Sequence, residues 1–135
     1  MFEGTVVNLI TSVTLVNNTE KIIDISVPTG ERWQILSLRF LNPDDVQRAC
    51  SFKVFKEAAK TNFVVWLLAP ALTAGAAGQW PSNTSSTTTM TIPPAILAEG
   101  NIIEAKWAAG GASAGGTDAD GLVVNYIKRA ARGAE

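Results

Sequence analysis

The sequence contains no histidine and a single cysteine, Cys50, among its 135 residues. Imidazole and thiolate are the usual ligands of zinc, and His is the usual base of a nucleophilic triad, so one chain lacks the groups for either site. A lone cysteine also excludes a disulfide within the chain. We expect Cys50 to be a small buried apolar residue. The sequence therefore predicts no cofactor, no metal site and no enzymatic activity.

Excess charge of one sign and a long apolar run are missing as well. Eleven Lys and Arg residues balance twelve Asp and Glu residues, for a net charge of −1, whereas nucleic-acid binding needs a basic excess. The most apolar run, residues 63–69, is far shorter than the ~20 residues of a membrane-spanning helix. Residues 1–4 lack the positive charge of a secretory signal. We expect no nucleic-acid partner, no membrane span and synthesis in the cytoplasm.

The chain has the size and the composition of one packed domain. With 135 residues, 47% of them hydrophobic, a single domain over residues 1–135 buries a core without disulfides or metal. Apolar residues recur with period two in short runs that end at Gly, Pro, Asn or Asp, which is typical of antiparallel strands. We predict an all-β, antiparallel, jelly-roll-like β-sandwich of about eight strands. The runs are Val13–Val16, Ile22–Val27, Arg32–Leu41, Ala49–Lys56, Phe63–Ala69, Gly78–Trp80, Thr84–Ile92, Asn101–Trp107 and Leu122–Ile127.

The longest of these runs, Arg32–Leu41, contains a change of phase. Leu36, Leu38 and Phe40 alternate on one face, but Trp33 and Ile35 fall on the other. Either a β-bulge near Ile35 and Leu36 or burial on both faces would reconcile the two sets.

The ends and one connection leave alternatives open. Residues 1–10 form either an N-terminal arm that reaches a neighbouring subunit or a simple first strand. The polar residues 128–135 are expected to fray. Residues 57–62 favour a hairpin connection over a short helical loop.

Paired carboxylates are the remaining candidates for chemistry. Asp44 and Asp45 lie in a Pro-containing turn, and Asp118 and Asp120 lie in a Gly-rich loop with a fragment of a calcium-loop pattern. In such places acidic side chains are hydrated or cap turn amides. The run 110–116 lacks the Lys-Ser/Thr ending of a phosphate-binding loop and is expected to be a flexible connection. We therefore predict no catalytic or calcium site.

Charge is absent from one long stretch of the chain. Between Lys60 and Glu99 lie 38 consecutive residues without Asp, Glu, Lys or Arg, where even placement would put about six. Depletion of charge with retained aromatic residues marks the centre of a protein interface. The alternative is a buried strand followed by two neutral, solvated loops. We predict an oligomer interface that includes Trp66, Leu68, Leu72, Trp80 and Met90.

Two segments resemble small β-sandwich virion proteins of tailed bacteriophages. Val27–Ile35 combines a Pro-x-Gly turn with a Trp-bearing strand, and Ile92–Ile103 combines a Pro-Pro segment with a Gly turn. The resemblance implies a jelly-roll-like, non-enzymatic decoration or cement protein on the capsid surface. It also implies a homotrimer that clamps neighbouring copies of the major capsid protein.

A second hypothesis is a carbohydrate- or receptor-binding module of a phage tail or fibre. Trp80, between Gln79 and Pro81, looks like a loop aromatic that is free to meet a ligand, and indole rings pack against sugars. Asp118 and Asp120 would supply the polar contacts to that sugar.

Overall fold

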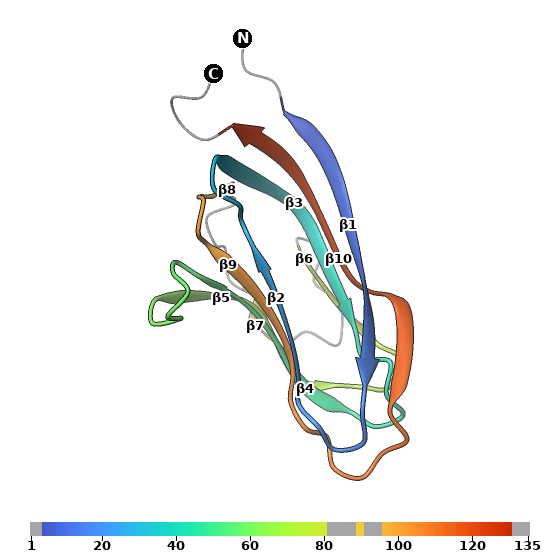
Figure 1. The fold of residues 1–135 in the computed structure, drawn as a ribbon. Helices are drawn as coiled ribbons and strands as arrows, with labels where there is room; N and C mark the ends of the chain where they lie inside the picture. Colours follow the sequence, from blue (N-terminus) through green and yellow to red (C-terminus); the bar gives the residue numbers. More distant parts are fainter. Residues whose placement is uncertain (1–3, 81–88, 91–95, 131–135) are drawn as a thin grey trace.

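Two antiparallel sheets form the fold in the computed structural model, which describes residues 4–80, 89–90 and 96–130, with only the backbone at residues 63–71, 80 and 89–90 (Figure 1). All secondary structure in these ranges is β-strand. The strands are β1 (Thr5–Leu15), β2 (Lys21–Ser26), β3 (Glu31–Leu41), β4 (Arg48–Phe55), β5 (Phe63–Leu72), β6 (Ala77–Trp80), β7 (Thr89–Met90), β8 (Ile96–Leu97), β9 (Ile102–Trp107) and β10 (Gly116–Ala130).

The strand order is that of a jelly roll. Sheet A has the order β1-β10-β3-β6, with β8 also paired to β3, and sheet B has the order β2-β9-β4-β5-β7. The antiparallel pairs are nested, because β1 pairs β10, β2 pairs β9, β3 pairs β6 and β4 pairs β5. The chain thus forms one long hairpin that is folded over on itself, with β4 and β5 at its tip. The predicted all-β sandwich is confirmed, and the eight strands of four or more residues build it.

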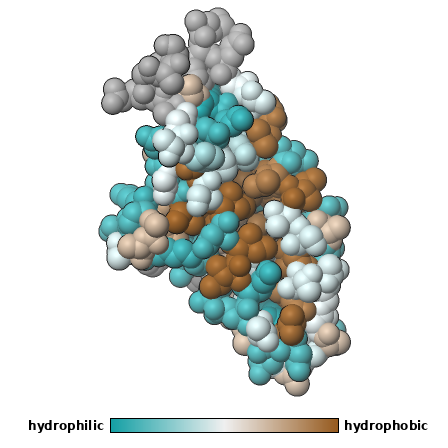
Figure 2. All heavy atoms as spheres, in the orientation of Figure 1, coloured by the Kyte–Doolittle hydropathy of each residue, from teal (hydrophilic) through white to brown (hydrophobic). Residues whose placement is uncertain are grey.

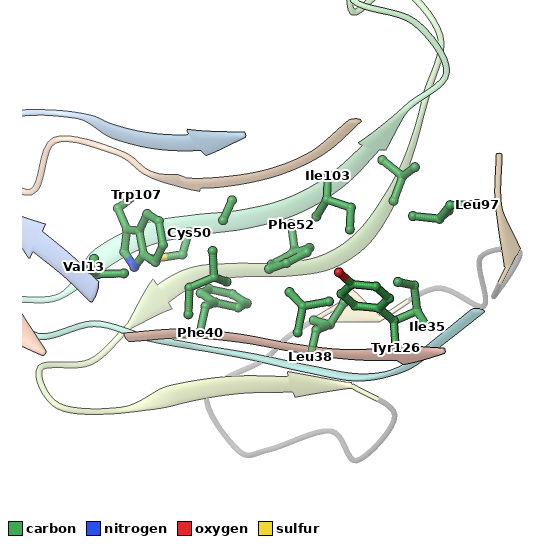
Figure 3. Close-up of a cluster of buried hydrophobic side chains, with 14 of the residues drawn as sticks. Val13, Ile35, Leu38, Phe40, Cys50, Phe52, Leu97, Ile103, Trp107 and Tyr126 are labelled. Atoms are coloured by element: carbon green, nitrogen blue, oxygen red, sulfur yellow. The ribbon is translucent and has the colours of Figure 1, made fainter. Parts of the chain in front are cut away.

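Aromatic side chains fill the space between the sheets (Figure 3). The Phe40 ring of sheet A lies 5.7 Å from the Phe52 ring and 6.2 Å from the Trp107 ring of sheet B, measured between centroids. Trp107 also donates its indole N–H to the Leu41 carbonyl at 2.9 Å. Towards the other end of sheet A, Trp33 stacks on Tyr126 at 3.9 Å. Buried aromatic pairs of this kind contribute both area and orientation, so the contacts of Phe40 with Phe52 and Trp107 help to fix how the two sheets face each other.

The phase change in β3 is a β-bulge at Leu36. Ser37 pairs with Asn125 and Ile35 pairs with Tyr126, so Leu36 has no partner opposite it on β10. Ile35 and Leu38 therefore both face the core, each 2% exposed, while Leu36 is 40% exposed. The bulge predicted near Ile35 and Leu36 is confirmed, and only the expectation that Leu36 shares the buried face is wrong.

Two strands are longer than their apolar patterns. β1 begins at Thr5 rather than Val13, and β10 extends from Gly116 to Ala130 rather than over residues 122–127. These two strands pair with each other from Thr5 opposite Lys128 to Leu15 opposite Gly116. The ladder hydrogen bonds are independent of side-chain polarity, so they extend both strands into polar and Gly-containing sequence.

This pairing settles what the sequence left open at the two ends. Residues 5–10 are the first half of a strand, not an arm. Residues 128–130 belong to β10, and residues 131–135 lie outside the described chain. Of the predicted strand Thr84–Ile92, only Thr89 and Met90 are described, and they form β7. Residues 57–62 are a hairpin connection without helix.

We expect Phe40→Ala to lower the free energy of unfolding by about 3–5 kcal/mol, because it leaves a cavity between the two sheets. Phe40 is 0% exposed and contacts the rings of Phe52 and Trp107. Urea unfolding followed by tryptophan fluorescence measures the loss. The matched control is Leu36→Ala, at the exposed bulge residue of the same strand, which should change stability by less than about 0.5 kcal/mol. Equal losses in the two variants would contradict the core assignment.

Candidate interaction surfaces

The charge-free window, residues 61–98, contains four described strands: β5, β6, β7 and β8. In the sheet orders, β6 in sheet A and β5 with β7 in sheet B are on the edges opposite to β1 and β2. In Figure 1, β6 and β7 are accordingly the fainter, more distant strands. The fold therefore gathers these strands at one lateral side, which we call the β5–β8 side.

The predicted interface residues divide between the core and this side. Leu72 is 0% exposed, so it belongs to the core and offers no surface. The reason is that β5 extends to Leu72, opposite the buried Arg48 of β4. Trp66, Leu68, Trp80 and Met90 lie on β5, β6 and β7 of the β5–β8 side. Trp66 is the extra residue of a bulge between the pairs Phe52–Leu67 and Lys53–Val65.

The residues of the carbohydrate hypothesis are not brought together. Trp80 lies in β6 opposite Leu38 of β3, and Leu38 lies opposite Val124 of β10. Asp120 and Asp118 are four and six residues away from Val124 along β10, towards the Gly116 end of that strand. Strand β3 thus separates the tryptophan from both carboxylates. The expectation that Asp118 and Asp120 lie in a loop is also wrong, because both are part of β10.

An ion pair between Asp44 and Arg48 is buried at one end of the sandwich. The two side chains are 0% exposed and approach to 2.7 Å. The Arg48 guanidinium donates from Nε to Asp44, from Nη1 to the carbonyls of Thr19 and Ala108, and from Nη2 to the carbonyl of Val16. Each of the three guanidinium nitrogens therefore has at least one acceptor. Of the two alternatives for Asp44, hydration is wrong and capping of turn amides is confirmed, because its carboxylate accepts from the amides of Asp45 and Gly115.

Burial and hydrogen bonding act in opposite directions on Asp44. Burial raises its pKa, but the hydrogen bonds from Arg48, from the Asp45 amide and from Ser113 outweigh this and lower the pKa from 3.8 to about 2. Asp44 is therefore ionised at neutral pH and holds the charge of Arg48 in place. A catalytic acid or base needs a pKa near the operating pH, so this pair is structural.

Hydrogen bonds also anchor the Gly-rich connection between β9 and β10, which the sequence predicts to be flexible. Amide groups of residues 111–115 donate to the side chains of Asn18, Asn17, Asp45 and Asp44, at 2.8–3.1 Å. At Gly116 a Cβ would lie only 2.0 Å from the Pro43 carbonyl oxygen, so this position requires glycine. The glycines thus permit a close approach to the residue 42–45 turn.

Asn42 joins a further connection to the same end. It is 0% exposed, and its side chain donates to the carbonyls of Val46 and Leu72 at 2.9 Å and accepts from the Asp44 amide at 3.0 Å. Its backbone accepts from the Gly75 amide. The turn between β5 and β6 is therefore tied to the turn between β3 and β4.

Cys50 is a buried structural residue, as the sequence predicts. It is 3% exposed. Burial raises the pKa of the thiol to about 12, so it remains protonated at neutral pH. Because the thiolate is the reactive form of cysteine, this residue is inert.

Ion pairs lie on the outer face of sheet B over β2 and β9. The Lys60 ammonium, in the connection between β4 and β5, lies 2.8 Å from Glu104 of β9 and 3.0 Å from Asp24 of β2. It also lies 5.5 Å from the centre of the Phe55 ring. Its hydrogen bonds to Glu104 and then Asp24 raise the pKa of Lys60 against the effect of burial. A further pair joins Lys106 to Glu20. Paired charges of this kind are typical of a solvated face.

A second apolar surface, which the sequence analysis missed, lies where β1 and β2 form the edges of the two sheets. Figure 2 shows hydrophobic residues gathered in the middle of this face. Val6, Ile10 and Ile22 are 69%, 48% and 42% exposed. Between the edges, partly buried aliphatic side chains pack against the core, namely Val7, Leu9, Ile23 and Ile25. The only sequence signal was the absence of charge in residues 4–19.

No protein-family model, curated protein or solved structure matches this chain. In the described ranges no group of three or more Cys, Asp or Glu side chains is arranged to hold a metal ion. The described chain also has no helix of the length and apolarity that crossing a membrane requires.

We expect Asp44→Asn to lower the free energy of unfolding by roughly 3 kcal/mol at pH 7, because it leaves the Arg48 charge buried without a counter-charge. A carboxyl whose pKa is depressed in the folded state adds stability above its unfolded pKa and loses it as the pH falls through the folded value. The wild-type chain should therefore lose stability between about pH 4 and pH 2, and the variant should lose less there.

Urea unfolding across this pH range measures both effects. Asp45→Asn is the control, since Asp45 is exposed beside Asp44. The same pH profile in wild type and Asp44→Asn would show that the pair does not hold this end of the sandwich.

At Lys60 we expect Lys60→Gly to be more stable than Lys60→Ala by about 1 kcal/mol. The backbone φ of Lys60 is +58°, in the left-handed region that favours glycine. Both substitutions remove the ammonium group, so their difference reports the backbone alone. Thermal unfolding at one pH compares the stability of the two variants. Equal stability of the Ala and Gly variants would contradict backbone strain at Lys60.

Proposed function

We propose that this chain is a structural virion protein of a tailed bacteriophage, made in the host cytoplasm and bound to the outside of the capsid. In this role it is a non-enzymatic decoration or cement subunit that binds the major capsid protein and bridges neighbouring capsid subunits. It is proposed to act as an oligomer of identical copies. The resemblance of Val27–Ile35 and Ile92–Ile103 to phage virion proteins, with a jelly-roll topology that viral capsid proteins also use, supports this proposal.

The observation that carries the proposal is the place of the charge-free window. Solvated surfaces normally mix both charge signs, and the outer face of sheet B does so with Lys60, Asp24 and Glu104. The β5–β8 side instead comes from 38 residues without a charge. Charge depletion distinguishes the centre of an interface from other surface. The same molecule thus has one face suited to water and one side suited to a protein partner.

The use of the ionisable groups is consistent with a binding role. Arg48 and Asp44 bind each other in a buried hydrogen-bond network. Lys60 is paired with two carboxylates. These side chains hold strands and turns together, which supports the proposal of a structural, surface-binding role.

The test is co-sedimentation with purified capsids of the phage whose genome encodes the chain. We expect saturable binding, a higher temperature of capsid disruption on binding, and at least about tenfold weaker binding for Trp80→Ala, since interface tryptophans often dominate affinity. Ile22→Ala is the control, because Ile22 is an exposed residue of β2, on the other side of the sandwich.

Absence of binding to capsids would refute the proposal. A glycan-array signal that Trp80→Ala removes, without capsid binding, would favour the carbohydrate- or receptor-binding module in its place.

A further inference from the structure

Strand β1 is a long edge strand without the usual protection. It is eleven residues long, and in the described chain it pairs only with β10. Sheet edges in natural proteins are generally short, charged, interrupted by proline or covered, because unpaired backbone groups invite another strand. Residues 5–15 contain neither a charged residue nor a proline. The other edge strands differ, since β2 carries Lys21 and Asp24, and β6, β7 and β8 are at most four residues long.

Apolar side chains of this edge strand lie on both faces of the sheet. Val6 and Ile10 project from the outer face and are 69% and 48% exposed. Val7 and Leu9 face the core but remain partly exposed at the open side of the sandwich. A strand added beside β1 would therefore cover both aliphatic pairs and the free backbone groups together.

The sequence of β1 is chemically symmetric about Asn8. In an antiparallel pair of two β1 strands centred on this residue, Val6 lies opposite Ile10 and Val7 lies opposite Leu9. Thr5 then lies opposite Thr11, and Asn8 lies opposite its own copy. Each apolar residue meets an apolar residue and each polar residue meets a polar one, on both faces of the sheet. The bulge between Thr11 and Val13 marks the end of this regular segment.

We infer that β1 pairs with β1 of a second copy of this chain, antiparallel about a two-fold axis at Asn8, so that sheet A continues from one copy into the other. A contact that a surface makes with itself across a two-fold axis requires such self-complementarity. The absence of charge also favours pairing with a second copy, because two uncharged β1 strands do not repel each other. Pairing of β1 with β1 produces a dimer, whereas the trimer that the resemblance implies would need a different contact between copies.

The contact leaves the β5–β8 side available. Strand β1 and the strands β5 to β8 lie at opposite edges of the sandwich, so a paired copy still presents its charge-free side. The inference rests on the self-association included in the proposed function. It is tested in solution without capsids, so its failure and the failure of capsid binding are separate results.

The test is the molar mass of the full chain by sedimentation velocity from 1 to about 100 µM. We expect a dimer for the wild type. Two double variants, Val6→Lys with Ile10→Lys and Val6→Glu with Ile10→Glu, should each be monomeric, because like charges then face each other across the axis. An equimolar mixture of the two should restore the dimer mass, since opposite charges meet in the mixed pair.

Ile96→Glu is the matched control. Ile96 is 54% exposed and lies in β8, on the other edge of sheet A, so this variant should keep the wild-type mass. Circular dichroism reports whether each variant folds, and Val6→Glu alone replaces any double variant that does not. A wild-type monomer, a wild-type trimer, or a dimer unchanged by the double variants would each overturn the inference.

Discussion

The ion pair between Asp44 and Arg48 is the interaction on which one end of this sandwich depends. A buried guanidinium is costly unless a counter-charge and hydrogen-bond acceptors surround it. Arg48 obtains its carbonyl acceptors from two connections far apart in the sequence, between β1 and β2 and between β9 and β10. Asp44 accepts a further hydrogen bond from the β9–β10 connection, and Asn42 ties in the end of β5. The strands of both sheets are therefore joined at this end by polar contacts. The aromatic core around Phe40 holds the middle.

Polar contacts close the end of the sandwich at Asp44 and Arg48, and the core fills its middle. The surfaces that we propose to contact other molecules lie on the two lateral sides. The two sides differ in the length of the sequence that lacks charge. The β5–β8 side is neutral over a long stretch of sequence, which we propose to meet a different protein. The β1 edge is neutral over one strand whose residue types are symmetric, which suits a copy of itself. A jelly roll with one side for self-association and the other for a larger assembly is consistent with a subunit that bridges its partners.

The hydrophobic pattern of the sequence predicted the strand segments that face the core, but it did not predict the full length of β1 and β10. Alternation over Arg32–Leu41 located the bulge, because a single extra residue reverses the face of every residue that follows it. It did not show that Thr5–Ser12 and Gly116–Gly121 are strand, since their pairing comes from ladder hydrogen bonds between residues about 100 positions apart. The pattern also placed Leu72 in an interface, because charge content alone does not distinguish a core residue from a surface one.

The sequence by itself determined that the chain is all-β, has no histidine or disulfide chemistry, and keeps charge out of residues 61–98. These properties follow from composition and short-range periodicity, which are local. Only the tertiary structure decided which residues the fold unites, such as Asp44 with Arg48 and Lys60 with Asp24 and Glu104. It also decided that β1 is an edge strand, because a strand's neighbours are set by the order of strands in a sheet, which depends on the whole chain.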